Sequence, residues 1–554
     1  MAAVLASAAA AAAAAAKPCL RLGGAAAAAR SAWRGQRAGS ATASTAEPPP
    51  AHLSYDPSQA SDTATLLLLA RSATASGHRD EGFWRACSLQ AQRLLGSATL
   101  GDLASFAEAA ATARHRDDEL LYNLGDALAQ RSGELDADTL ARALRAHALL
   151  GLRNDRVLPR LREALFELMQ RSGATAGGLA GALQSLAQLS AAGLMSPVPR
   201  DLLDAAARMV AEHVAFFSAG QLCGVLDAFA ACAVRSDPQA AAMFASAGDA
   251  IARGSRELTA EHCANAVRAL AKCRVHDERL TVAVAARLRE SEVRGGLDAQ
   301  QLVSALYGFA KFTSQDTALF DILSIEVRRR LHGMDVTQVS GALASLGKAG
   351  ISSPVLAARA AAQLRRAPTA ELDAAPLEAL GTGAMAFGKL QVRDAALFDV
   401  FAEAFLRRGG ALFRQEPCDS LVNISHAFTK VHLVHAGLFS AIARTLLDRF
   451  EELSVQDIVR YLHGLAKVSH PLPVQLQERF CALSPSSLHS LGAFDLLKLA
   501  TAARRLGLHL PAVEEQVKAV LPNEPSGSEL LAPPRPPQKR KLRRPSARRM
   551  KWNW

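Results

Sequence analysis

The sequence predicts an all-α fold, an α-solenoid of about eleven or twelve helix-turn-helix repeats of roughly 39 residues. The first observation is a recurring phrase, clearest as CANAVRALAKC at 263–273, LVSALYGFAKF at 302–312 and IVRYLHGLAKV at 458–468. With the large residue before the final Ala-Lys as anchor, seven copies lie 37 to 41 residues apart, at Phe229, Leu270, Phe309, Leu346, Phe387, Phe428 and Leu465. Weaker copies surround Leu69, Ala110, His147, Leu186 and Ala503. Helical units repeated at such a period stack into solenoids.

The second observation is the pattern inside each repeat. Apolar residues fall at anchor −7, −4, −3, 0 and +3, the spacing of a buried helical stripe. The residue just before the anchor is always small, which allows a neighbouring helix to approach closely: Ala228, Ala269, Gly308, Ser345, Ala386, Ala427 and Gly464. A second helix follows in each repeat, as in ALFDILSIEVRRRL (318–331), ALFDVFAEAFLRRG (396–409) and GLFSAIARTLLDRF (437–450). These helices end in Arg, which suits the negative C-terminal end of a helix dipole.

The third observation is the start of the first helix in each repeat. Polar residues of the kind that cap helix N-termini recur there, namely Asp136, Ser218, Thr259, Asp298, Asp335 and Ser454. An apolar pair flanks each cap at the spacing of a hydrophobic staple, for example Leu297 with Leu302. Residues three positions after the cap, such as Gln221 and Gln301, complete the pattern of a capping box.

The two ends of the chain differ in composition from the repeats. Residues 1–46 are rich in Ala, Arg and Ser and contain no acid, which predicts an organellar targeting segment removed on import. An Ala-biased low-complexity tail and a secretory signal are the alternatives. The mitochondrial matrix is the predicted destination of the targeting segment, and the plastid is the second choice. Residues 47–60 form a Pro-rich linker, 61–520 the α-solenoid, and 521–554 a basic tail predicted to be disordered until it meets a partner.

The net charge of +11 is unevenly placed along the chain. Five basic residues lie in 1–46 and nine in 535–554, with no acid in either segment, so residues 47–534 carry a net charge of −3. A uniformly basic, nucleic-acid-coating domain is therefore excluded. The eight cysteines include no CxxC pair and fall mostly in apolar helical patterns, which excludes a secreted disulfide scaffold.

The repeat phrase resembles that of the heptatricopeptide and octotricopeptide families of organellar RNA-binding proteins, which are related to the leucine-rich repeats of FAST-kinase-like proteins. Asn265, Ala269, Leu270, Ala271 and Lys272 match it, as do Asn423, Ala427, Phe428 and Lys430. The resemblance covers roughly residues 60–510 and implies an α-solenoid that binds RNA in processing, stabilisation or ribosome assembly. Many members end in a nuclease-like RAP domain, whereas the sequence after residue 510 shows the basic tail and no such domain.

The candidate RNA-binding residues share one face of the first helix. Anchor +2 is a cation in six consecutive repeats, at Lys272, Lys311, Lys348, Lys389, Lys430 and Lys467. Anchor −5 and −2 lie on the same face and vary, with Asn265, Arg268, Tyr307, Asn423, His426, Arg460 and His463 as the polar or stacking occupants. The lysines can bind phosphate while the variable residues meet bases. The alternative is that the lysines only cap helix ends and keep the surface solvated. Gly341, Ala344 and Met385 cannot read bases, so recognition by shape and phosphate is favoured over a complete code.

The tail is the second candidate RNA-binding segment. It joins cations to two terminal aromatic residues that can stack on bases: Arg540, Lys541, Arg543, Arg544, Arg548, Arg549, Trp552 and Trp554. The stretch KRKLRR at 539–544 also has the composition of a nuclear localisation signal.

These patterns predict a non-catalytic organellar RNA-binding protein. It would stabilise rRNA or mRNA as a mitochondrial ribosome subunit or assembly factor, with RNA and neighbouring proteins of a ribonucleoprotein as partners. No phosphate loop, HExxH or GxSxG motif occurs, so no enzyme, cofactor, metal or small-molecule substrate is expected. No membrane insertion is expected either. The alternative is a protein-binding scaffold of a mitochondrial respiratory or import complex that does not contact RNA.

Overall fold

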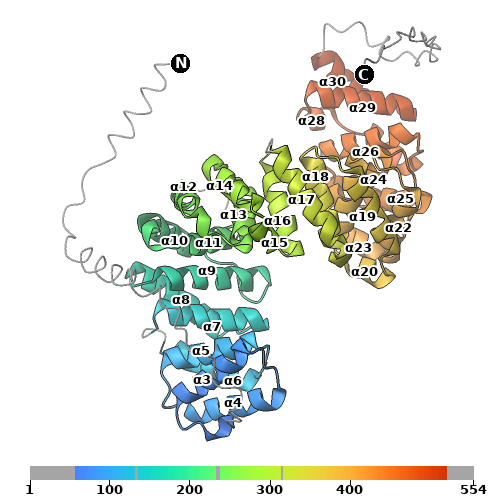
Figure 1. Ribbon diagram of the computed structural model, residues 1–554. Helices are drawn as coiled ribbons and strands as arrows, with labels where there is room; N and C mark the ends of the chain where they lie inside the picture. Colours follow the sequence, from blue (N-terminus) through green and yellow to red (C-terminus); the bar gives the residue numbers. More distant parts are fainter. Residues whose placement is uncertain (1–55, 132–134, 172, 233–237, 313–315, 521–554) are drawn as a thin grey trace, which may run out of the picture. The chain divides into compact units, whose positions relative to one another are not determined.

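The computed structural model describes residues 56–520, apart from 132–134, 172, 233–237 and 313–315. No strand occurs among these residues, and the helices follow one another as stacked pairs (Figure 1). Twelve of the described helices are the first members of a pair, here called A helices. They are α3 (Thr63–Ala75), α5 (Leu100–Thr112), α7 (Ala137–Leu150), α9 (Ala176–Ala191), α11 (Ala219–Ala231), α13 (Ala260–Cys273), α16 (Ala299–Lys311), α18 (Val336–Lys348), α21 (Leu377–Lys389), α24 (Cys418–Lys430), α26 (Val455–Val468) and α29 (Ala493–Leu506).

Each A helix is followed by a second helix, here called the B helix of that repeat. These are α4 (Glu81–Leu94), α6 (Asp118–Gln130), α8 (Val157–Gln170), α10 (Arg200–Glu212), α12 (Pro238–Arg253), α14 (Glu278–Arg289), α17 (Thr317–Arg330), α19 (Pro354–Arg366), α22 (Ala395–Arg407), α25 (Ala436–Asp448), α27 (Val474–Cys481) and α30 (Pro511–Val520). Short helical turns fill several connections, namely η2 (Pro57–Gln59), η4 (Val214–Phe216), η5 (Ser255–Glu257), α15 (Ser291–Gly295), η6 (Leu331–Gly333), α20 (Thr369–Ala374), α23 (Gly409–Gln415), η7 (Phe450–Glu452) and α28 (Pro485–Leu488).

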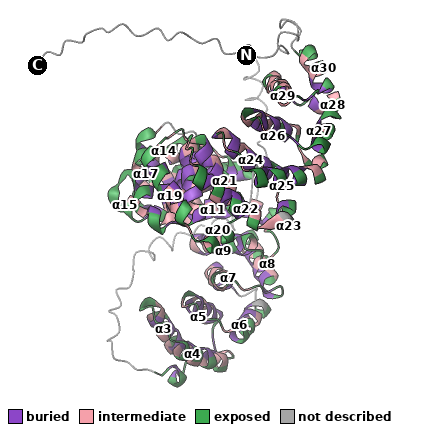
Figure 2. Ribbon diagram, turned by 90° about the vertical axis from the view of Figure 1, so that its right-hand side faces the viewer, coloured by how far each residue is buried: buried purple, intermediate pink, exposed green. Residues whose placement is uncertain are grey.

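The arrangement confirms the predicted all-α solenoid. Every anchor proposed from the sequence lies within an A helix, including the weak copies at Leu69 and Ala503. Neighbouring A helices pack against each other, as α7 does on α9 and α24 on α26, and neighbouring B helices do so too, as α10 does on α12 and α22 on α25. Most helices carry both buried and exposed residues (Figure 2), as expected for two-layered stacking.

The predicted helix starts are also confirmed. Ser218, Thr259 and Asp298 each cap their A helix in a full capping box with the residue three positions on. Asp335 and Gln338 exchange the same two hydrogen bonds at the start of α18, with N···O distances of 3.2 and 2.8 Å. The staple residues pack inside, since Leu297 and Leu302 are almost fully buried.

The small residue before each anchor lets neighbouring A helices touch. A Cβ atom added at Gly308 of α16 would lie only 2.7 Å from the carbonyl carbon of Val267 in α13. At Gly464 of α26, a Cβ would lie 2.8 Å from Oγ1 of Thr429 in α24. At Gly308 the close atom belongs to the backbone of Val267, so glycine is required there for the observed helix spacing.

In four repeats, an arginine at the end of the B helix closes the helical hairpin. Arg330 donates to the carbonyl oxygen of Gly295 at 2.9 Å, and Arg449 to that of Glu416 at 2.5 Å. Arg408 binds the carbonyls of Leu372 and Ala375, and Arg287 that of Leu258. In each case the acceptor precedes the A helix of the same repeat. These arginines therefore join the end of one helix to the start of its partner, a role beyond the predicted interaction with the helix dipole.

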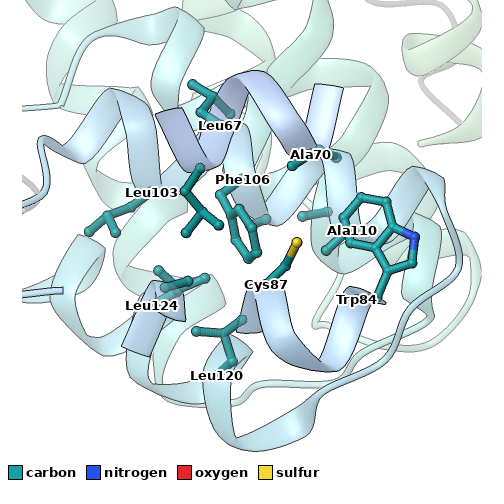
Figure 3. Packing of buried hydrophobic residues seen from close by; sticks show 14 of the residues in the cluster. Leu67, Ala70, Trp84, Cys87, Leu103, Phe106, Ala110, Leu120 and Leu124 are labelled. Carbon is teal, nitrogen blue, oxygen red and sulfur yellow. The ribbon is translucent and has the colours of Figure 1, made fainter. Parts of the chain in front are cut away.

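The solenoid begins on a core built by the first two repeats. Leu67, Trp84, Cys87, Phe106 and Leu120 converge from α3, α4, α5 and α6 (Figure 3). The indole of Trp84 donates a 2.9 Å hydrogen bond to the carbonyl oxygen of His78, so its polar atom is satisfied although the ring is buried. Pro57 and Ala60, at the end of the predicted linker 47–60, are buried as well.

The chain divides into two compact units. Of the described residues, those up to Arg330, with Lys348–Ile351, form the first, and Leu331–Gly347 with those from Ser352 to Val520 form the second. None of the helices in the described part of the chain is both long and apolar enough to cross a membrane. The predicted targeting segment, the linker up to residue 55 and the basic tail lie outside the described residues.

Candidate nucleic-acid interface

The predicted lysines occupy the same place in successive repeats. Each lies in the last turn of its A helix, and all are exposed except Lys430, which is half-buried. Among the described residues, Lys272, Lys311, Lys389, Lys430 and Lys467 make no hydrogen bond and no ion pair. No lysine of this set of five therefore binds a terminal helix carbonyl, the contact that the capping alternative requires.

In the second unit, Lys430 lies close enough to the lysines of the flanking repeats for their charges to affect it. Burial lowers the pKa of the Lys430 ammonium, and the charges of Lys467 and Lys389 in the flanking repeats lower it further. Three cations from α21, α24 and α26 thus form one row, here called the lysine row. A row of cations without counter-ions is an unfavourable arrangement that a polyanion relieves.

The residues at −5 and −2 of α24 and α26 share a helix face with these cations and lie one to two turns nearer the helix start. Arg460 donates a 2.9 Å hydrogen bond to Oδ1 of Asn423, its equivalent one repeat earlier. Burial, together with Lys430, Lys467, Arg460 and His463, lowers the pKa of His426 to about 4. The imidazole of His426 is therefore neutral at pH 7, so it can hydrogen-bond to a base but cannot act as a cation for phosphate.

The corresponding residues of the first unit are partly engaged within the protein. The Arg268 guanidinium forms an ion pair with Asp227, which occupies the equivalent position in α11, and it contacts Asn265 at 3.4 Å. Burial raises the pKa of Asp227, while Arg268 and Lys272 oppose this effect. Tyr307 remains exposed and Ser304 is buried. Arg268 is thus neutralised internally, which the sequence pattern did not reveal.

Two neighbouring hollows lie over the A helices of the second unit. The larger, of ≈ 570 Å³, is lined by residues of α18, α21, α24 and α26, among them Glu378, Met385, Lys389, Asp419 and Lys430. The smaller, of ≈ 380 Å³, is lined by residues of α24, α26 and α29, including Gln456, His463, Lys467 and Lys498. His426 and Arg460 line both, so we call the two together the A-helix groove.

The groove has two chemically different edges. Its C-terminal edge carries the lysine row at anchor +2, and its N-terminal edge carries Glu378, Asp419 and Gln456 at anchor −9. Positions that are 11 residues apart on a helix are separated by ~16 Å along its axis. A single strand of nucleic acid, with its phosphates on one side and its bases on the other, matches this difference between the two edges.

Sequence reasoning missed the residues that the twelfth repeat contributes. Lys498 lines the groove at anchor −5 of α29, and Arg505 stands at anchor +2, where earlier repeats carry lysine. Burial lowers the pKa of His463, and Lys467, Lys498 and Arg505 lower it further, so Arg505 extends the lysine row. The signal lay in the weak copy around Ala503, whose +2 position is basic.

Fold and groove together define a helical-repeat protein with a row of unpaired cations along its A helices. Residues 179–470 match the model of a family described as RNA-editing substrate-binding complex 6 protein. Because the match spans more than half of the chain, this protein belongs to that family. The family differs from the heptatricopeptide and octotricopeptide families that the repeat phrase resembles. The family match and the resemblance of the repeat phrase both indicate a helical-repeat protein associated with RNA.

Two further comparisons add little. No curated protein matches the chain. Among solved structures, a chain from a homology model of the full-length AP-3 complex in an intermediate open conformation is 10% identical, over 84% of this chain and 92% of that one. Its TM-score of 0.24 is too low to bear on fold or function.

Proposed function

We propose that this protein is a non-catalytic RNA-binding subunit of a mitochondrial ribonucleoprotein and that it holds single-stranded RNA in the A-helix groove. The observation that carries the proposal is the lysine row. Lys389, Lys430 and Lys467 have no counter-ion among the described residues, and the charges of Lys389 and Lys467 add to burial in lowering the pKa of Lys430. The family name supports RNA as the ligand and favours an RNA-editing assembly over the ribosomal role that the sequence suggested. The Arg- and Ser-rich segment 1–46 supports the mitochondrial location, with the plastid as second choice.

The groove favours a single strand over a duplex because its two edges differ. Phosphates would lie on the lysine row, and bases would point across the helices towards Asn423, His426 and His463. Glu378 and Asp419 on the far edge can accept hydrogen bonds from amino groups of bases, and they repel phosphate. The neutral His426 offers a base a donor or an acceptor without adding charge. The predicted tail cations, from Arg540 to Arg549, would strengthen binding without defining its position.

Binding of a labelled 12-nucleotide oligoadenylate to the full chain tests the proposal. The variant Lys389→Glu/Lys430→Glu/Lys467→Glu should bind at least tenfold more weakly. The salt dependence of its binding, as the slope of log K against log salt, should be shallower by about 2, since each lost phosphate contact removes about 0.7.

The matched control makes the same charge change away from the groove. Arg328, Arg444 and Lys518 are exposed residues of B helices, and their triple substitution by Glu should leave groove binding nearly unchanged. Equal weakening by both triples would mean that RNA binds through net charge alone, and the groove would not be the site. Absence of binding by the unaltered chain would overturn the proposal as a whole.

One observation favours a second function, a protein-binding scaffold. In the first unit, Asp227 neutralises Arg268, so that part of the A-helix surface is less suited to a polyanion. Purification of the chain from mitochondria before and after ribonuclease treatment separates the two functions. Partners held through RNA leave after treatment, whereas partners of a scaffold remain bound to both the unaltered chain and the lysine-row variant.

A further inference from the structure

Phe494 is the most exposed large apolar side chain among the described residues. It lies in the first turn of α29 and is 71% exposed. A single exposed apolar residue is ordinary on a protein surface, so exposure alone indicates nothing. Its position in the repeat and its neighbours are what distinguish this residue.

Repeat register places Phe494 on the edge of the A-helix groove. It stands at anchor −9 of the twelfth repeat, the position held by Glu378, Asp419 and Gln456 in the three preceding repeats. Those three residues line the groove. Asp495, the next residue along α29, lines the smaller hollow as well. The N-terminal edge, polar in three repeats, therefore ends on an aromatic ring.

A cation lies against this ring. The Lys498 ammonium is 4.0 Å from the Phe494 ring centroid, and it also forms a 2.9 Å ion pair with Asp495. Lys498 itself lines the groove. The Phe494 ring therefore lies next to the groove, because the Lys498 side chain contacts the ring and also lines the groove.

Further cations gather at this end of the groove. Lys467, Lys498 and Arg505 all act on His463, whose pKa they lower in addition to burial. They come from two neighbouring A helices, α26 and α29. Aromatic rings beside cations in a groove are the combination with which proteins bind single strands, the ring taking a base and the cations the phosphates.

We propose that Phe494 is a nucleobase-stacking site at the C-terminal end of the A-helix groove, where one base of single-stranded RNA stacks on the ring and the adjoining phosphates bind Lys467, Lys498 and Arg505. This inference rests on the proposed function and adds to it a stacking contact with a base and the residue that makes this contact. Stacking tolerates any base because every base has a π face, and purines stack on the ring over a larger area.

The test compares two oligomers of equal charge on the full chain: the 12-nucleotide oligoadenylate and an abasic ribose-phosphate chain of the same length. The Phe494→Ala variant should bind oligoadenylate about tenfold more weakly and the abasic chain as well as the unaltered protein does. The slope of log K against log salt should not change, because no phosphate contact is removed. Phe494→Trp should restore binding, and its added fluorescence should be quenched by oligoadenylate but not by the abasic chain.

A matched control removes another exposed apolar side chain of the second unit. Val474 on α27 is 63% exposed and outside the groove, so Val474→Ala should leave binding unchanged. If Phe494→Ala binds oligoadenylate normally, or loses affinity for both oligomers alike, the stacking site is wrong while RNA binding by the lysine row stands. If the unaltered chain binds neither oligomer, the proposed function fails, and the stacking site with it.

Discussion

The side chains of Asn423 and Arg460 join neighbouring repeats, since Nη1 of Arg460 donates a 2.9 Å hydrogen bond to Oδ1 of Asn423. Both residues occupy anchor −5, and both are half-buried. Arg460 also contacts Asp457 of its own helix at 3.3 Å. Two residues for which the sequence suggested contact with RNA thus satisfy each other across the repeat boundary.

This hydrogen bond should be measurable as coupling in protein stability. Asn423→Ala and Arg460→Ala each leave the partner without its hydrogen bond, so the double variant should lose less stability than the sum of the two single losses. We expect a coupling free energy of about 0.5–1.5 kcal/mol, from urea unfolding of the four proteins of a double-mutant cycle. Effects that add to within ~0.3 kcal/mol would show that the bond does not contribute in solution.

The sequence was sufficient to predict the fold because every repeat carries the same local signals. The cap, the staple, the apolar stripe and the small residue before the anchor all fall in one register, and each specifies where an A helix begins and what it buries. Gly308 illustrates this, since the predicted close approach is visible at Val267. Even the degenerate copy at Ala503 is an A helix, because hydrophobic spacing tolerates changes in residue identity.

The groove was less predictable because it depends on which side chains face each other across repeats. The lysine row follows from one recurring position, and the charges of Lys389 and Lys467 do lower the pKa of Lys430. The pairing of Arg268 with Asp227, however, depends on the lateral stagger of α11 and α13, which no single repeat encodes. Phe494 and Arg505 were missed because the twelfth repeat lacks the phrase that marks the others.

The packing requirement at Gly308 gives a second prediction. In Gly308→Ala the new methyl group would lie 2.7 Å from the Val267 carbonyl carbon, so α13 and α16 must move apart. We expect a loss of about 1–3 kcal/mol in the free energy of unfolding, measured with urea. Gly295→Ala is the matched control because nothing lies within 4 Å of its added Cβ. An equal effect of both substitutions would contradict close packing at Gly308.

His426 gives a prediction of pH dependence. Its pKa in the folded protein is about 4, below its ordinary value of 6.5, because burial and the charges of Lys430, Lys467, Arg460 and His463 disfavour the protonated ring. Between these two pH values the unfolded chain binds more protons than the folded one, so the free energy of unfolding rises with pH. Above pH 6.5 the contribution is complete, and it falls as the pH drops towards 4.

The change is measured by urea unfolding at pH 7 and pH 5. One such group contributes a slope of at most about 1.4 kcal/mol per pH unit, and His426→Gln should remove that share. The pKa values of His463 and His470 are lowered too, so some pH dependence should remain in the variant. An identical pH dependence in His426→Gln and the unaltered chain would show that His426 titrates normally in the folded protein.

The arginines of the B helices should matter for stability and not for RNA. Arg449 binds the carbonyl oxygens of Phe413 and Glu416, which precede α24, and it also pairs with Glu452. Arg449→Ala should lower the free energy of unfolding by about 1–2 kcal/mol because these carbonyls lose their donor. Arg444 is an exposed arginine of the same B helix, and Arg444→Ala should change stability by less than ~0.5 kcal/mol.

Under conditions where both variants are fully folded, each should bind oligoadenylate as the unaltered chain does. A loss of RNA affinity confined to Arg449→Ala would assign this arginine to the RNA interface, whereas equal stability of the two variants would show that its carbonyl contacts do not close the hairpin.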